Sequence, residues 1–172
     1  MRSTFVARPQ YKFSAAHMTV FPDGRKERLH GHNYQLSARL YLRDVSPAIM
    51  FDFAAIKEGL RVVCAELNER TLVALHNPFL LVSVDEHAAA GQGGQVRLSH
   101  RDGEYLLPLS DVALLPIDNI SSERLAEYCH EKLAGYLRRE LPVLVCSAIA
   151  ELEVKVEELP GQGASYRAEL CV

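Results

Sequence analysis

The sequence has 172 residues, of which 48% are hydrophobic and 24% are charged, so it is long enough for one soluble domain with a substantial core. Its net charge of −3 argues against a nucleic-acid-binding protein, which needs a broad basic surface. The longest mostly apolar stretch, residues 141–150, is too short to cross a bilayer, and the first residues lack the apolar run of a signal peptide, so we expect a cytoplasmic protein.

Two strands are predicted at the start of the chain by alternating apolar and polar positions. Between about residues 5 and 17, one face carries Tyr11, Phe13, Ala15 and His17. Between residues 32 and 42, the even-numbered positions are mainly apolar and the odd-numbered ones mainly polar, which is typical of a half-buried strand. We expect the two strands to pair as a hairpin.

Two helices are predicted further along the chain. The first follows Asp52, a residue favoured as an N-cap, and runs to about Glu69. The second follows Ser121 or Ser122 and runs to about Glu140. In both segments the apolar residues recur at the three- and four-residue spacing of one helix face.

The segment between the helices, about residues 79–116, is predicted to be a β insertion. It holds a strand-like run at 80–84 and a hairpin over 95–100 and 104–109 that turns at Asp102-Gly103. Two more strands, near 152–158 and 165–172, follow the second helix. The order β-β-α-α-β-β, with the β insertion between the helices, predicts an α+β fold: an antiparallel four-stranded sheet with two helices on one face. We expect residues 1–172 to form a single domain.

The four cysteines are Cys64, Cys129, Cys146 and Cys171, and none belongs to a C-x-x-C pair. Cys64 and Cys129 fall on the apolar faces of the predicted helices, where a thiol behaves as a small hydrophobic group. We therefore expect buried, reduced thiols.

A metal site is predicted from three histidines. His30 and His32 stand two residues apart on a strand, so their side chains point to the same face. His17 ends the preceding strand, and pairing of the two strands would bring the three rings together at one end of the sheet. Three neutral nitrogens with an open position are typical of a catalytic zinc site. An isolated His-x-His pair is more often a surface or core feature, so the prediction depends on His17 meeting the pair.

Five segments of the chain form a distinctive set: Phe13–His17, His30–Tyr34, Phe51–Phe53, Ile120–Glu123 and Val154–Glu158. With these segments the chain resembles the family of 6-pyruvoyltetrahydropterin and 6-carboxytetrahydropterin synthases. This resemblance implies a tunnelling fold, a zinc ion on His17, His30 and His32, a pterin substrate, and a homohexamer with active sites at the subunit interfaces.

Glu158 is the candidate pterin anchor. Its position on the strand has the inward parity of Val154 and Val156, and a buried carboxylate is costly unless it is paired. One carboxylate can accept hydrogen bonds from both a ring N–H and the neighbouring amino group of a pterin, and the resemblance implies this role. A frayed strand end with a solvated Glu158 is the alternative. The resemblance also implies that Ser122 and Glu123 line the pterin pocket, although both residue types suit helix capping.

Glu27 is the candidate catalytic residue. Most family members carry a cysteine where this chain has Lys26, whereas the pattern Glu-x-x-His-Gly-His resembles the type III branch, in which a glutamate takes the place of the cysteine. A carboxylate beside a metal can accept and return protons. The alternative is an ordinary charged residue in a polar loop.

The usual Asp-His proton relay of the family has no direct match. The corresponding residues here are Asn68 and Glu69, and His76 is a possible substitute or a plain loop residue. The relay therefore stays unassigned. No pattern supports a role for His87, His100 or His130, which we expect at the surface.

These observations predict a zinc-dependent lyase that cleaves the side chain of dihydroneopterin, or of its triphosphate, to 6-hydroxymethyl-dihydropterin, a step that the type III branch contributes to folate synthesis. The first alternative keeps the fold and the metal but yields 6-carboxytetrahydropterin, for deazapurine (queuosine) synthesis, or 6-pyruvoyltetrahydropterin. A second alternative is a non-catalytic homologue that binds zinc and pterin. A third is a structural zinc protein, which would unfold on chelation.

Overall fold

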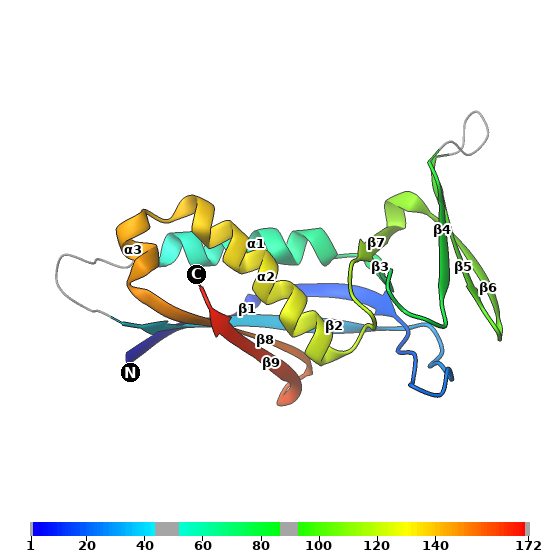
Figure 1. Ribbon diagram of the computed structural model, residues 1–172, viewed down its shortest axis with the longest axis horizontal. Helices are drawn as coiled ribbons and strands as arrows, with labels where there is room; N and C mark the ends of the chain where they lie inside the picture. Colours follow the sequence, from blue (N-terminus) through cyan, green and yellow to red (C-terminus); the bar gives the residue numbers. More distant parts are fainter. Residues whose placement is uncertain (1, 44–51, 87–92, 171–172) are drawn as a thin grey trace.

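The computed structural model describes residues 2–43, 52–86 and 93–170, which form a six-stranded sheet, a three-stranded sheet and three α-helices. Helices α1 and α2 cover one face of the larger sheet, and the smaller sheet stands at one end of it (Figure 1). The helices are α1 (Phe53–Leu67), α2 (Ser122–Glu140) and α3 (Val143–Ser147). The strands of the larger sheet are β1 (Arg2–His17), β2 (His30–Leu42), β3 (Arg70–Ala74), β7 (Val112–Leu115), β8 (Ile149–Leu159) and β9 (Gln162–Glu169).

The larger sheet has the strand order β7-β3-β1-β2-β8-β9. Its four strands β1, β2, β8 and β9 pair antiparallel as predicted, but β3 and β7 extend the sheet beyond β1 in parallel. The predicted four-stranded antiparallel sheet is therefore wrong, and the sheet is six-stranded and mixed. The added strands are only five and four residues long, too short to show a clear alternating pattern. They form because the edge of β1 offers unpaired backbone groups.

The main core lies between the larger sheet and the two long helices. Both predicted helices are confirmed, with Asp52 as the N-cap of α1 and Ser121 as the N-cap of α2. The Asp52 side chain accepts a hydrogen bond from the Ala54 amide at 2.8 Å. Burial of the apolar stripes of both helices against the inward-facing side chains of β1, β2 and β8 fixes which face of each strand is covered. The fully buried residues of this core include Phe13, Leu36, Leu40, Leu60, Leu125, Leu133, Leu152 and Val154.

The predicted β insertion contains the smaller sheet, made of β4 (Leu81–Asp85), β5 (Gln95–His100) and β6 (Gly103–Pro108). The β5–β6 hairpin turns where predicted, and Gly103 takes a φ of 141° that suits glycine. A 3₁₀ turn, Leu109–Asp111, leads from β6 into β7. The inner face of this sheet forms a second, smaller core with residues of β1's end, β3 and β7: Met18, Val73, Leu80, Val96, Leu98 and Val112.

Several expectations about individual residues need correction. Cys146 is disulfide-bonded, so the expectation of reduced thiols holds only for the free, buried Cys64 and Cys129. Pairing depends on which chain segments meet in space, which the spacing of cysteines does not reveal. His100 and His130 are buried, not at the surface. His87 and Cys171 lie outside the described residues.

The structure also contains helix α3, which was not predicted, inside the apolar stretch 141–150. In the described ranges, no helix combines the length and the apolar character needed to cross a membrane.

Candidate metal centre

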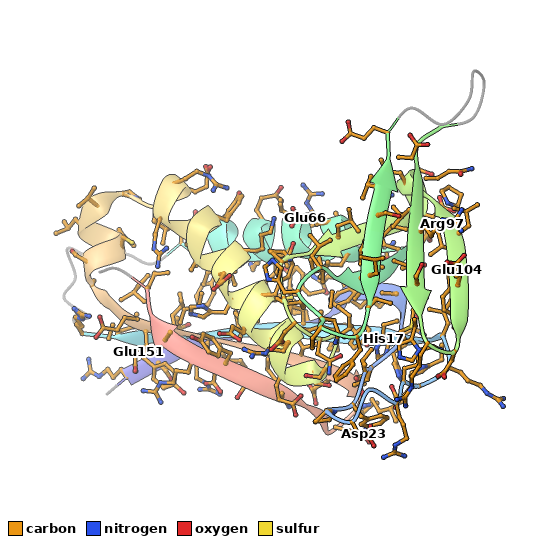
Figure 2. All side chains as sticks on the ribbon, turned by 45° about the vertical axis from the view of Figure 1, so that its right-hand side comes forward. His17, Asp23, Glu66, Arg97, Glu104 and Glu151 are labelled. Carbon is orange, nitrogen blue, oxygen red and sulfur yellow. The ribbon has the colours of Figure 1, made fainter. Side chains whose placement is uncertain are left out.

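The three histidines meet at the end of the larger sheet. In the β1–β2 pairing, His17 lies opposite His30, and Ala15 lies opposite His32. The ring centroid of His17 is 4.5 Å from that of His30 and 5.3 Å from that of His32, and the centroids of His30 and His32 are 4.9 Å apart. One nitrogen from each ring lies within 4.8 Å of the others. Figure 2 shows His17 at this end, next to the smaller sheet.

The burial of His17 distinguishes this cluster from three surface histidines. His17 is only 2% exposed, and both of its ring nitrogens are buried without a hydrogen-bond partner in the described parts of the chain. Burial, together with the nearby rings of His30 and His32, lowers the pKa of His17. Its imidazole is therefore neutral near pH 7 and keeps a lone pair that a metal ion can accept.

His30 is oriented by a hydrogen bond from its second nitrogen. Nδ1 lies 2.8 Å from the carbonyl oxygen of Arg28. Because a carbonyl can only accept, Nδ1 carries the proton and Nε2 keeps its lone pair for a metal. Gly31 lies tightly against β1, since a Cβ there would sit 3.1 Å from the Ala15 carbonyl oxygen. These features fit a centre that three histidines hold.

Glu27 lies beside this cluster, on a hairpin formed by residues 18–27. Its backbone amide donates to the Thr19 carbonyl at 2.9 Å, and its carboxylate accepts from the Thr19 amide at 3.4 Å. Burial alone would disfavour ionisation of Glu27. The hydrogen bonds from Thr19 and the electrostatic influence of the nearby His30 and His17 rings outweigh that effect and lower the pKa of Glu27. Glu27 is therefore an ionised, half-buried carboxylate that can accept a proton near the histidines.

Glu158 also lies near the cluster. The last residue pair between β2 and β8 at this end is Gln35 with Glu157, and Glu158 is the next residue along β8. Glu158 is half-buried, and its charge raises the pKa of His17 in part and that of Tyr34. The carboxylate therefore lies near enough to His17 and Tyr34 to affect their ionisation. Its role as a pterin anchor stays a prediction.

Tyr34 is a site residue that the sequence analysis missed. Its ring centroid lies 5.6 Å from His32 and 5.9 Å from His17, and it stacks on Phe13 at 4.9 Å. Its hydroxyl is fully buried and has no hydrogen-bond partner among the described residues. Burial, with smaller contributions from Glu158 and Glu27, raises the pKa of the Tyr34 hydroxyl, which stays protonated. Its position two residues after His32 was the available signal.

The start of α2 lies next to the Glu27 hairpin, because the Thr19 hydroxyl donates to the Ile120 carbonyl at 3.1 Å. Ser122 is half-buried there, and Glu123 is exposed. A hydrogen bond from Ser121 lowers the pKa of Glu123, which is the capping role that was the alternative for this residue. The part of Ser122 and Glu123 in a pterin pocket stays a prediction.

Of the residues considered for the relay, Glu69 shares a cavity with His32, whereas Asn68 and His76 make other contacts. The Asn68 side chain accepts from the Ser14 amide at 2.9 Å and helps to end α1. Glu69 has a left-handed φ of 57° and lines a cavity of about 480 Å³ with His32, beside Asn33 and Arg70. His76 is exposed and lines a separate cavity of about 270 Å³ against α2. The described residues thus give no support to His76 as a relay beside the cluster.

Comparison with known proteins gives consistent results. A family model described as 6-pyruvoyl tetrahydropterin synthase matches residues 8–169. A curated Methanocaldococcus jannaschii protein, provisionally described as a 6-carboxy-5,6,7,8-tetrahydropterin synthase, is 30% identical over 162 residues, which are 94% of this chain and 92% of that protein. The 6-pyruvoyl tetrahydropterin synthase of Plasmodium vivax is 28% identical, with a TM-score of 0.83 and 98% of each chain covered.

Two further structures of the P. vivax protein, each 27% identical to this chain, are described as catalytic-residue mutants in which alanine or cysteine replaces a glutamate. The Plasmodium falciparum 6-pyruvoyl tetrahydropterin synthase has the same TM-score of 0.83 at 24% identity, which shows the shared fold.

Proposed function

The chain belongs to the 6-pyruvoyl tetrahydropterin synthase family, and we propose that it is a zinc-dependent lyase that cleaves the side chain of a reduced pterin. The substrate is dihydroneopterin or its triphosphate, and the product is 6-hydroxymethyl-dihydropterin. One observation carries the proposal: the carboxylate of Glu27, and not a cysteine, lies beside the three histidines. The catalytic glutamate of the similar P. vivax protein supports the same assignment here.

In this proposal His17, His30 and His32 hold Zn²⁺, whose chemistry when bound is to polarise a hydroxyl oxygen of the substrate side chain. Glu27 takes the proton of that hydroxyl as the adjacent carbon–carbon bond breaks and the outer fragment leaves as an aldehyde. It then returns the proton to the carbon that stays on the pterin, so the protons balance. Glu158 accepts hydrogen bonds from the ring N–H and the amino group of the pterin and fixes its orientation.

The nearest rival keeps the same site and changes the product to 6-carboxytetrahydropterin or 6-pyruvoyltetrahydropterin, as the names of the M. jannaschii and P. vivax relatives suggest. The presence of Lys26 at the cysteine position favours the glutamate-based cleavage. We also propose that the protein is a cytoplasmic homohexamer with its active sites between subunits, and light scattering coupled to gel filtration tests its mass.

Mass spectrometry of the pterin products tests the function. The zinc-loaded protein is incubated with dihydroneopterin or with its triphosphate, beside the Glu27→Gln variant. Glu58→Gln is the control, since Glu58 is half-exposed and pairs with Arg61 on α1, a helix that carries none of the three histidines. We expect 6-hydroxymethyl-dihydropterin from the wild type and the control, and a rate lower by roughly 10²- to 10⁴-fold from Glu27→Gln.

The other outcomes distinguish the alternatives. Release of triphosphate with the 6-carboxy or 6-pyruvoyl product supports the rival enzyme, and turnover that survives Glu27→Gln contradicts the proposed role of Glu27. Pterin binding without any product supports a non-catalytic homologue. Unfolding on chelation, with no pterin binding, supports a structural zinc protein.

A further inference from the structure

The hairpin that carries Glu27 has little to hold it in place by itself. Residues 18–27 are closed by backbone hydrogen bonds from Phe21 to Arg25 at 2.7 Å and from Glu27 to Thr19 at 2.9 Å, and by a bridge between Val20 and Lys26. An isolated two-stranded hairpin is marginally stable in water at best. The position of the Glu27 carboxylate therefore depends on what the hairpin packs against.

One side of the hairpin is held by the segment before α2. The Asn119 side chain accepts from the Val20 amide at 3.1 Å and donates to the Val20 carbonyl at 2.8 Å. Thr19 contacts Ile120 as described above. These bonds fix the base of the hairpin, but they do not reach its tip at residues 23–25.

The tip is held by His100, at the end of β5. The His100 side chain is 1% exposed, and its Nε2 lies 2.9 Å from the Gly24 carbonyl oxygen. Nδ1 accepts from the Asp102 amide at 3.2 Å, so Nε2 carries the proton and donates to Gly24. Gly24 has a φ of 78°, and the Phe79 ring occupies the space where a Cβ would sit, 3.0 Å away. The tip and the insertion therefore fit closely. In Figure 2, Asp23 of the tip lies near the end of the β5–β6 hairpin.

Tyr105, on β6, holds the strand that leads into Glu27. The Lys26 ammonium donates to the Tyr105 hydroxyl at 3.0 Å and lies 5.3 Å from the centroid of the Tyr105 ring. The same ammonium is 3.4 Å from the Glu27 carbonyl oxygen. Met18, which starts the hairpin, is buried in the core of the smaller sheet. Contacts with the insertion therefore reach the hairpin at its start, at its tip and at the residue before Glu27.

We propose that the β4–β6 sheet is the frame that positions Glu27 at the metal centre, and that His100 and Tyr105 are positioning residues for the reaction. This inference rests on the proposed function, in which Glu27 moves the proton. A displacement of about 1 Å in a reacting group can reduce the rate by roughly 10²-fold. The β4–β6 sheet, which supplies none of the three histidines, thereby contributes to catalysis.

Kinetics of four variants test the proposal. His100→Leu removes both ring hydrogen bonds, and His100→Gln restores an N–H that can donate to Gly24. Tyr105→Phe removes the acceptor of Lys26 and keeps the ring. The control is His130→Leu, which also removes a buried histidine, but from the middle of α2. Zinc content and pterin KM are measured for each.

We expect His100→Leu to lower kcat by roughly 10- to 100-fold, Tyr105→Phe to lower it less, and His100→Gln to recover most of the loss. KM and zinc content stay at wild-type values, because neither residue touches the histidines or the pterin anchor. His130→Leu keeps the wild-type kcat at temperatures below its unfolding. Equal losses of kcat in His100→Leu and His130→Leu contradict the proposal.

A double variant shows whether the frame acts through Glu27. Adding His100→Leu to Glu27→Gln should leave the residual kcat unchanged, since the group being positioned has lost its function. A further loss equal to that seen in the wild-type background overturns the proposal.

Amide hydrogen exchange separates a failure of this proposal from a failure of the proposed function, because it needs no turnover. His100→Leu should speed exchange of the Glu27 amide at least tenfold, and His130→Leu should not. If exchange responds in this way but no pterin is converted, the frame holds the hairpin and the proposed function fails. If the Glu27 amide exchanges at the wild-type rate in His100→Leu, the frame proposal fails whatever the activity.

Discussion

Replacing His17 by leucine should stabilise the metal-free protein and abolish its stabilisation by zinc. His17 is 2% exposed, and neither ring nitrogen has a partner in the described ranges. A buried polar group without a hydrogen bond costs about 1–3 kcal/mol. Leucine has a similar volume and removes that cost, so the free energy of unfolding of the metal-free protein should rise by an amount of this order.

Thermal unfolding measures both effects. For a chain of this length, 1 kcal/mol shifts Tm by about 2–4 °C, so metal-free His17→Leu should melt about 2–12 °C above the metal-free wild type. Free zinc at about 100 times its Kd should add ~2.7 kcal/mol to the wild type and nothing to the variant. The difference between the melting temperatures of the two proteins should therefore narrow or change sign when zinc is added.

Two results would refute this reasoning. If metal-free His17→Leu melts below the metal-free wild type, the ring nitrogens of His17 have partners in solution and are not held ready for a metal. If zinc stabilises the variant as much as the wild type, the bound ion does not depend on the three-histidine cluster. Calorimetry in the presence of a chelator, and again with zinc restored, gives all four melting temperatures.

Three further predictions follow from other parts of the structure. Glu158→Gln should weaken pterin binding by roughly 10- to 100-fold with zinc content unchanged, because charge-assisted hydrogen bonds contribute about 1.5–3 kcal/mol. Titration of pterin fluorescence measures the affinity, and a wild-type affinity would exclude Glu158 as the anchor. Gly31→Ala should lower zinc affinity by roughly tenfold, since the added methyl group would lie 3.1 Å from the Ala15 carbonyl oxygen. Competition with a chelator measures the zinc affinity, and an unchanged affinity would mean that β1 and β2 adjust freely. Burial, aided by Arg138 and opposed in part by Glu127, keeps the pKa of His130 below its ordinary value of 6.5. Below about pH 6.5 the unfolded chain therefore binds a proton at His130 that the folded protein does not bind. The free energy of unfolding should fall as the pH drops through this range. Urea unfolding at pH 7 and 5.5 should show a smaller loss of unfolding free energy in His130→Leu than in the wild type. Equal losses in the two proteins would rule out His130 as a cause of the pH dependence.

The periodic parts of the chain could be predicted well from the sequence. Alternation placed His30 and His32 on one face of a strand, and the face of β1 that carries Phe13 also carries His17. The helix starts were predicted at Asp52 and at Ser121 or Ser122, because capping depends on a few neighbouring residues, and the structure places the caps at Asp52 and Ser121. The roles of Glu27 and Glu158 came mainly from a family resemblance, since a single charged residue has no periodic pattern of its own.

Other features depended on contacts between distant segments. The short strands β3 and β7 join the larger sheet because the edge of β1 accepts them, and their own sequences are too brief to indicate it. His100 carries no local sign of burial, yet the fold brings it to Gly24, 76 residues away along the chain.

The sequence by itself therefore determined the local elements and the inward face of the three histidines, because side-chain direction follows from the period of a strand. Only the tertiary structure decided that His17 is sealed from water, that Tyr34 joins the site, and that the insertion holds the Glu27 hairpin. These properties arise from desolvation and from hydrogen bonds between segments that meet only after the chain has folded.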